Sequence, residues 1–249
     1  MLKALLLLLK AGKFGKILLT SGSMIISVFA YALIFGLPYA AGFVLLIFVH
    51  EMGHFLAAKQ KGLDVGAPTF IPFVGAWIQL KEQPMNVATE AYVALAGPLA
   101  GTLGALFCYF LARSQGSTLL LALSYSGFMI NLFNLIPVSP LDGGRIVAIL
   151  SPKIWLLGAP LLLGLFMWRP SPMLILILIL ALPNVVQVWR EHFGKKNGES
   201  PVGSLPSGYY DAPFELKFKY GACYLGLAAF LAIMCYELSE MLPRTGGAS

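Results

Sequence analysis

Residues 38–58 read PYAAGFVLLIFVHEMGHFLAA, an apolar run that contains His50, Glu51 and His54. A run of about twenty apolar residues predicts a membrane-spanning helix. In a helix, two histidines four residues apart lie on one face, one turn apart, which allows two neutral imidazoles to share one zinc ion. The glutamate between them is expected to face the same ion. Because ionisable groups are costly inside a bilayer, these three residues are candidates for a functional site within the membrane.

The composition is that of a membrane protein. The chain is 58% hydrophobic and 11% charged, whereas a soluble domain carries about 25% charged residues. We therefore expect an all-α polytopic protein with six to seven transmembrane helices. The count is six if 154–168, which contains Pro160 and Gly164, is re-entrant. The expected spans are 17–37, 39–58, 90–112, 118–137, 154–168, 172–189 and 220–240.

The basic residues predict the orientation of these spans. If the N-terminus is cytoplasmic and seven spans alternate, all of the 17 Lys and Arg residues except Arg113, Arg169 and Arg244 fall on the cytoplasmic side. Such an excess follows the positive-inside rule, so we expect a cytoplasmic N-terminus and an outside C-terminus. The net charge of +6 is then a topology signal, and we do not expect nucleic acid as a partner.

The other segments predict one membrane domain with short flanks. Residues 69–80, TFIPFVGAWIQL, are rich in β-branched and aromatic residues and predict a short membrane-associated β-hairpin. A loop packed on the helices is the alternative. The expected divisions are a basic interfacial segment at 1–16, a membrane domain at 17–189, a cytoplasmic linker at 190–219 and a C-terminal transmembrane helix at 220–240.

Two histidines leave a catalytic zinc ion short of its usual three protein ligands. Asp142 is the best candidate for the third. Pro137 and Pro140 end the fourth span, and the glycines after Asp142 permit a sharp bend that can direct its carboxylate inward. The second and fourth spans are expected to run in the same direction, so both motifs reach the cytoplasmic side at similar depth. Weaker candidates are His192, Cys108, Cys223 and Cys235.

Taken together, HEMGH at 50–54 and NLIPVSPLDGG at 134–144 resemble motifs of the site-2 protease family of intramembrane zinc metalloproteases. Ala96-Gly97-Pro98 resembles a small-residue motif of the same family. The resemblance covers about residues 40–150 and implies a three-span catalytic core there.

The resemblance also implies residue roles and a substrate class. His50, His54 and Asp142 would bind one zinc ion per chain. Glu51 would be the catalytic base, and Asn134 would help to stabilise the oxyanion. The implied substrates are single-span membrane proteins within the lipid bilayer, cut either for signalling or to clear membrane stubs.

Two other classes of protein remain open. A membrane zinc protease of the prenyl-protein type would take its third ligand from a downstream glutamate, and a non-catalytic metal-binding membrane protein would keep the site without the reaction. Transporters usually distribute polar ligands along several spans, whereas here the polar groups cluster at one depth. The candidates for the downstream glutamate ligand are Glu90, Glu191 and Glu215.

Asn131, one turn before Asn134, is expected to share its face or to make an interhelical hydrogen bond.

Overall fold

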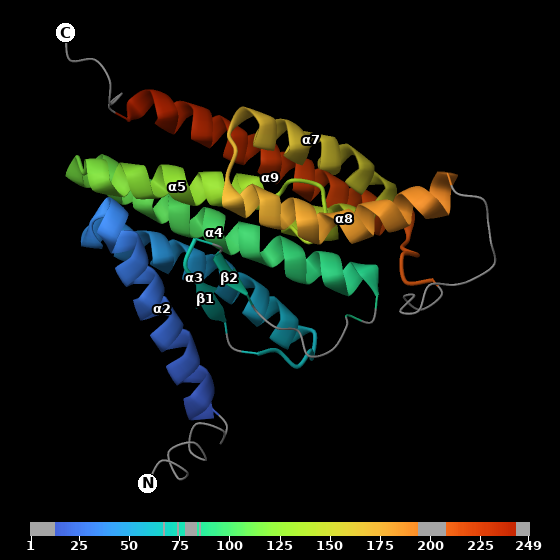
Figure 1. The fold of residues 1–249 in the computed structure, drawn as a ribbon, viewed down its shortest axis with the longest axis horizontal. Helices are drawn as coiled ribbons and strands as arrows, with labels where there is room; N and C mark the ends of the chain where they lie inside the picture. The colour runs from blue at the N-terminus through green and yellow to red at the C-terminus, as the bar shows by residue number, and fades with distance from the viewer. Residues whose placement is uncertain are drawn as a thin grey trace.

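The structure is a computed structural model. It describes all residues except 1–12, 67, 74, 78–83, 85, 194–207 and 243–249. In chain order the elements are α2 (Lys13–Phe35), α3 (Leu37–Gln60), β1 (Thr69–Ile71), β2 (Gly75–Trp77), α4 (Val87–Gln115), α5 (Thr118–Asn134), α6 (Asp142–Val147), the 3-10 helix η1 (Pro152–Ile154), α7 (Trp155–Trp168), α8 (Pro172–Phe193) and α9 (Phe214–Met241). Figure 1 shows long helices lying side by side, with the two strands beside α2 and α3.

The predicted all-α polytopic architecture is confirmed. Within the described residues, α2, α3, α4, α8 and α9 are long and apolar enough to cross a membrane. The helices α5 and α7 are apolar but shorter, with 17 and 14 residues. Each predicted span coincides with one of these helices, and α7 is continuous through Pro160. The choice between six and seven spans stays a prediction.

Several helix ends differ from the predicted boundaries. The helix α2 begins at Lys13, inside the segment predicted to be interfacial, and residues 1–12 lie outside the described residues. The helix α8 continues to Phe193 and α9 begins at Phe214, which shortens the predicted linker, whose middle, 194–207, is also not described. A span predicted from hydropathy stops at the first charged residues. The helix itself can extend beyond its apolar part, because its backbone hydrogen bonds do not depend on apolar side chains.

The centre of the bundle is formed by α3, α4 and α5, which pack in that order. Small residues allow these backbones to approach closely. A β-carbon at Gly53 of α3 would overlap the carbonyl of Ala96 of α4, and one at Gly127 of α5 would crowd Ala105 of α4. The backbones of α3, α4 and α5 therefore lie close together around the side chains between them.

The turn after α5 brings α6 back against the end of that helix. The helix α5 ends at Asn134, before Pro137, as the prolines predict. In α6, a β-carbon at Gly143 would overlap the backbone of Leu135, and one at Gly144 would overlap the backbone of Val138. The two glycines thus let α6 pack directly on the turn. The indole N–H of Trp155 donates to the Gly144 carbonyl at 2.8 Å and holds α6 from its other side.

The predicted β-hairpin is confirmed within the described residues. The strands β1 and β2 are antiparallel, with Phe70 opposite Ala76. Three hydroxyl groups on one face of α2 bind the hairpin. Thr20 donates to the Pro68 carbonyl at 2.7 Å, the Phe70 N–H donates to Ser23 Oγ at 3.0 Å, and the Phe73 N–H donates to the Tyr31 hydroxyl at 3.1 Å. The outer edge of β1 is therefore covered by α2.

Candidate metal centre

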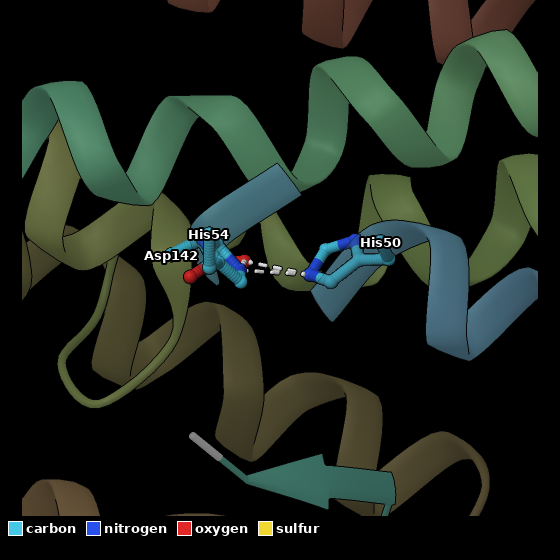
Figure 2. A group of neighbouring side chains, drawn as sticks. All are labelled: His50, His54 and Asp142. Carbon is cyan, nitrogen blue, oxygen red and sulfur yellow. Dashed lines mark hydrogen bonds and ion pairs between the residues drawn. The ribbon is translucent and has the colours of Figure 1, made fainter. Parts of the chain in front are cut away.

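The three predicted ligands lie together between α3 and α6. Figure 2 shows His50 and His54 from α3 and Asp142 from the start of α6 pointing toward one another. The Nε2 atoms of the two histidines are 3.1 Å apart. Asp142 Oδ2 lies 3.1 Å from Nε2 of His50 and 3.2 Å from Nε2 of His54. The side chains are only 5, 12 and 10% exposed for His50, His54 and Asp142.

The donor set fits a small divalent cation with nitrogen and oxygen ligands. In a tetrahedral site with bonds of about 2.1 Å, neighbouring donor atoms lie about 3.4 Å apart. The three distances in the structure are close to this value. With neutral imidazoles, three lone pairs converge on one buried point, an arrangement that is repulsive unless a cation lies between them.

The outer nitrogen of each imidazole has a hydrogen-bond acceptor that determines which ring nitrogen is free. The Nδ1 atom of His54 is 2.8 Å from the carbonyl oxygen of Val93 in α4. The Nδ1 atom of His50 is 2.8 Å from Oδ1 of Asn131 in α5. A hydrogen on each Nδ1 leaves both Nε2 lone pairs free for a metal ion. The interhelical hydrogen bond expected as one role of Asn131 is therefore present, and its partner is a predicted metal ligand.

Glycines on α4 make room for this arrangement. A β-carbon at Gly97 would overlap the His54 ring, and one at Gly101 would overlap the Asn131 amide. Gly97 belongs to the Ala-Gly-Pro motif that the sequence singled out, and the structure gives that motif a steric role. The sequence offered no signal for Gly101 beyond its place among small residues.

The other two predicted catalytic residues lie near the ligands in the chain. Glu51 is buried, with 8% of its surface exposed, and follows His50 directly. Asn134 is half-buried at the end of α5. Among the described residues, neither side chain has a hydrogen-bond partner.

The alternative third ligands are not gathered at this site. Glu90 instead accepts hydrogen bonds from Arg145 Nε at 3.2 Å and from the Tyr209 hydroxyl at 2.7 Å. Glu215 is exposed in the first turn of α9. The side chains of Glu191 and His192 lie outside the described part of the chain. Among the described residues, the group of His, Cys, Asp or Glu side chains able to hold a metal ion consists of His50, His54 and Asp142, without Cys108, Cys223 or Cys235.

The sequence interpretation missed the ion pair beside the site. Arg145 lies three residues after Asp142 on α6 and pairs with Glu90 of α4, so the helix that carries Asp142 is bound to α4 by an ion pair as well as by packing. Two opposite charges in apolar surroundings were visible in the sequence. Because they are 55 residues apart in the chain, the sequence does not show that they pair.

Comparison with known proteins finds similarity to zinc metalloproteases over part of this chain. The family model "Peptidase family M50" matches residues 38–125, which include α3 and α4 and end within α5. Zinc metalloprotease MJ0392 of Methanocaldococcus jannaschii is 34% identical over 124 residues, covering 46% of this chain and 36% of that protein. Probable zinc metalloprotease EGY1, chloroplastic, of Arabidopsis thaliana is 30% identical over 158 residues, covering 45% of this chain and 29% of that protein. The chain thus spans about a third of the length of these relatives.

Among solved structures, Site-2 Protease from Methanocaldococcus jannaschii aligns over 74% of this chain and 90% of its own, with 23% identity and a TM-score of 0.45.

Proposed function

We propose that this chain, whose residues 38–125 match the model of peptidase family M50, is an intramembrane zinc metalloprotease of the site-2 protease family. It would hydrolyse peptide bonds in or near the transmembrane segments of membrane proteins. The observation that carries the proposal is the buried triangle of His50, His54 and Asp142, whose ligand atoms lie 3.1 to 3.2 Å apart. The site lies in a helix that is long and apolar enough to cross a membrane.

The reaction assigns a role to each remaining polar group. His50, His54 and Asp142 would hold the zinc ion, which would lower the pKa of a water molecule and polarise the scissile carbonyl. The Glu51 carboxylate accepts a proton from the water and returns it to the leaving amine. The Asn134 side-chain amide donates to the oxygen of the carbonyl as negative charge develops there. The burial of Glu51 directly after His50 and the place of Asn134 at the end of α5, before Asp142, support these two roles.

The substrates we propose are single-span membrane proteins. A transmembrane helix hides its carbonyl groups in internal hydrogen bonds, so the segment to be cut must first unwind. An unwound segment can be held by adding to the edge of a sheet. Because α2 covers the outer edge of β1, the edge that we propose for the substrate is that of β2. The buried Phe70 packs the hairpin next to α3, with 6.3 Å between the ring centroids of Phe70 and Phe48.

We place the active site toward the cytoplasmic side, with the N-terminus in the cytoplasm and the C-terminus outside. The distribution of Lys and Arg residues supports this orientation. The protein is an integral membrane protein, so its partners include the surrounding lipid bilayer.

The test is cleavage of a panel of single-span membrane proteins by the purified chain in detergent, with zinc content measured in parallel. Glu51→Gln is the matched variant, since it keeps the size of the side chain and removes the base. We expect zinc in both proteins and cleavage by the wild type alone. A wild-type protein that contains no zinc would exclude the proposed function. Zinc with no cleavage of any substrate would favour the non-catalytic metal-binding alternative.

A further inference from the structure

We propose that Asn131 is a positioning residue of the metal centre, which holds the His50 ring so that Nε2 faces the metal ion. The inference rests on the proposed metal site and adds to it a residue outside the ligand set. Asn131 Oδ1 is 2.8 Å from Nδ1 of His50. Both residues are almost fully buried, with 2% and 4% of their surfaces exposed, so water does not provide an alternative partner for either group.

The orientation of the Asn131 amide follows from its second hydrogen bond. Its Nδ2 donates to the carbonyl of Gly127, one turn earlier on α5, at 2.7 Å. The amide nitrogen is thereby directed to the backbone and the amide oxygen to His50. An oxygen in that place can only accept, so Nδ1 of His50 carries the hydrogen and Nε2 carries the free lone pair.

The space around the amide permits little movement. A β-carbon at Gly101 of α4 would overlap the amide group, which therefore lies in direct contact with the α4 backbone. Asn131 is thus enclosed by α3, α4 and its own helix. A side chain of similar size without an acceptor would occupy the same space and leave the Nδ1–H of His50 buried and unpaired.

The two histidines differ in how their rings are held. His54 is held by a backbone carbonyl, that of Val93, which no substitution at residue 93 removes. His50 is held by a side chain, which a substitution does remove. Without its acceptor, the His50 ring can take the tautomer that carries hydrogen on Nε2, and this hydrogen competes with the metal ion for the same position. Loss of such an outer partner typically weakens metal binding by about 10- to 100-fold.

The experiment is a titration of the full chain in detergent with Co²⁺, followed by its visible absorption spectrum, and with Zn²⁺ in competition with a chelator. Asn131→Leu keeps the volume and removes the acceptor. Asn131→Asp keeps an acceptor oxygen at the same position. Ser124→Ala is the control, because Ser124 is a fully buried residue of the same helix whose hydroxyl donates to the Ala105 carbonyl of α4 rather than to a ligand.

We expect Asn131→Leu to bind Co²⁺ about 10- to 100-fold more weakly with an altered spectrum, and Asn131→Asp to bind more tightly than Asn131→Leu. Ser124→Ala should bind as the wild type does. Wild-type affinity and spectrum in Asn131→Leu would overturn the inference, as would an equal loss in Ser124→Ala. If Asn131→Leu does not fold, Asn131→Ala, which also lacks an acceptor, takes its place, with the same outcomes.

These outcomes are separate from those that test the proteolytic function. Metal affinity is measured without any substrate. A chain that binds metal and cuts nothing can therefore still show the dependence on Asn131, and an active protease can still fail to show it.

Discussion

The α-carbon of Gly97 lies so close to the imidazole of His54 that a β-carbon at residue 97 would overlap the ring. The contact joins the middle of α4 to His54, the second candidate ligand on α3. It explains why a residue without a side chain stands in the Ala96-Gly97-Pro98 motif. The position of the His54 ring therefore depends on the absence of a side chain at residue 97 of α4.

Gly97→Ala is expected to displace the His54 ring and to weaken metal binding by tenfold or more, about the loss that follows when a ligand is no longer held in place. The measurement is metal affinity by chelator competition. Gly104→Ala on the same helix is the control, since a β-carbon there would touch only the ends of the Leu46 and Val49 side chains, at 3.3 Å. Equal metal affinity in the two variants would show that the contact at Gly97 has no role in holding His54.

Replacing Asp142 with alanine is expected to remove the metal ion, because two histidines alone leave the site without its negatively charged ligand. Glu90→Gln is expected to retain the metal ion, because Glu90 pairs with Arg145 and Tyr209 instead. Zinc content of the purified variants distinguishes this arrangement from the prenyl-protein type of protease. Loss of zinc in Glu90→Gln with retention in Asp142→Ala would reverse the assignment.

Ala76→Pro is expected to reduce proteolysis strongly without loss of zinc. The Phe70 N–H binds Ser23, so Phe70 and Ala76 form a non-hydrogen-bonded pair and the Ala76 N–H points away from β1. Proline at residue 76 removes this donor from the proposed substrate edge. Ala76→Ser, which keeps the N–H, should cleave as the wild type does. Full cleavage by Ala76→Pro would mean that substrates do not pair with β2.

The hydroxyl of Tyr209 donates to Glu90, and this contact predicts a pH dependence. Burial, together with the nearby Glu90 carboxylate, raises the pKa of Tyr209 above its ordinary value. The unfolded chain titrates tyrosine at about pH 10. A group whose pKa is raised on folding adds stability below that pH and loses it as the pH rises further.

We therefore expect the wild type to lose thermal stability above about pH 10, and Tyr209→Phe to lose less over the same range. At neutral pH, Tyr209→Phe should be destabilised by about 1 to 2 kcal/mol through the lost hydrogen bond to a charged group. Thermal unfolding in detergent at several pH values measures both effects. Tyr236→Phe is the control, because Tyr236 is 67% exposed on α9. Parallel pH curves for wild type and Tyr209→Phe would contradict the prediction.

Cysteine labelling tests the proposed orientation. In a chain whose three cysteines are replaced by alanine, Lys153→Cys should react with a membrane-impermeant maleimide only from the cytoplasmic side, and Arg113→Cys only from the outer side. Both positions are exposed in the structure. Labelling of both residues from the same side would refute the alternation of spans on which the orientation rests.

The features that the sequence predicted correctly are those with a local physical cause. Apolar runs produce helices at the predicted spans, because a membrane helix satisfies its own backbone. His50 and His54 face one way because they are four residues apart in one helix. The turn that presents Asp142 follows from Pro137 before it and Gly143 after it. The hairpin at 69–77 follows from a short β-branched and aromatic segment.

The tertiary structure alone decided what surrounds these residues. Asn131 and His50 are separated by 81 residues in the chain, and Arg145 and Glu90 by 55. The choice of Asn131 as the partner of His50, of Val93 as the partner of His54, and of Gly97 as the residue beside it depends on how α3, α4 and α5 cross. Helix crossing is set by the fit of whole helix faces, which the local sequence pattern does not specify. The sequence by itself therefore determined the candidate ligands, and the packing of the helices determined how those ligands are held.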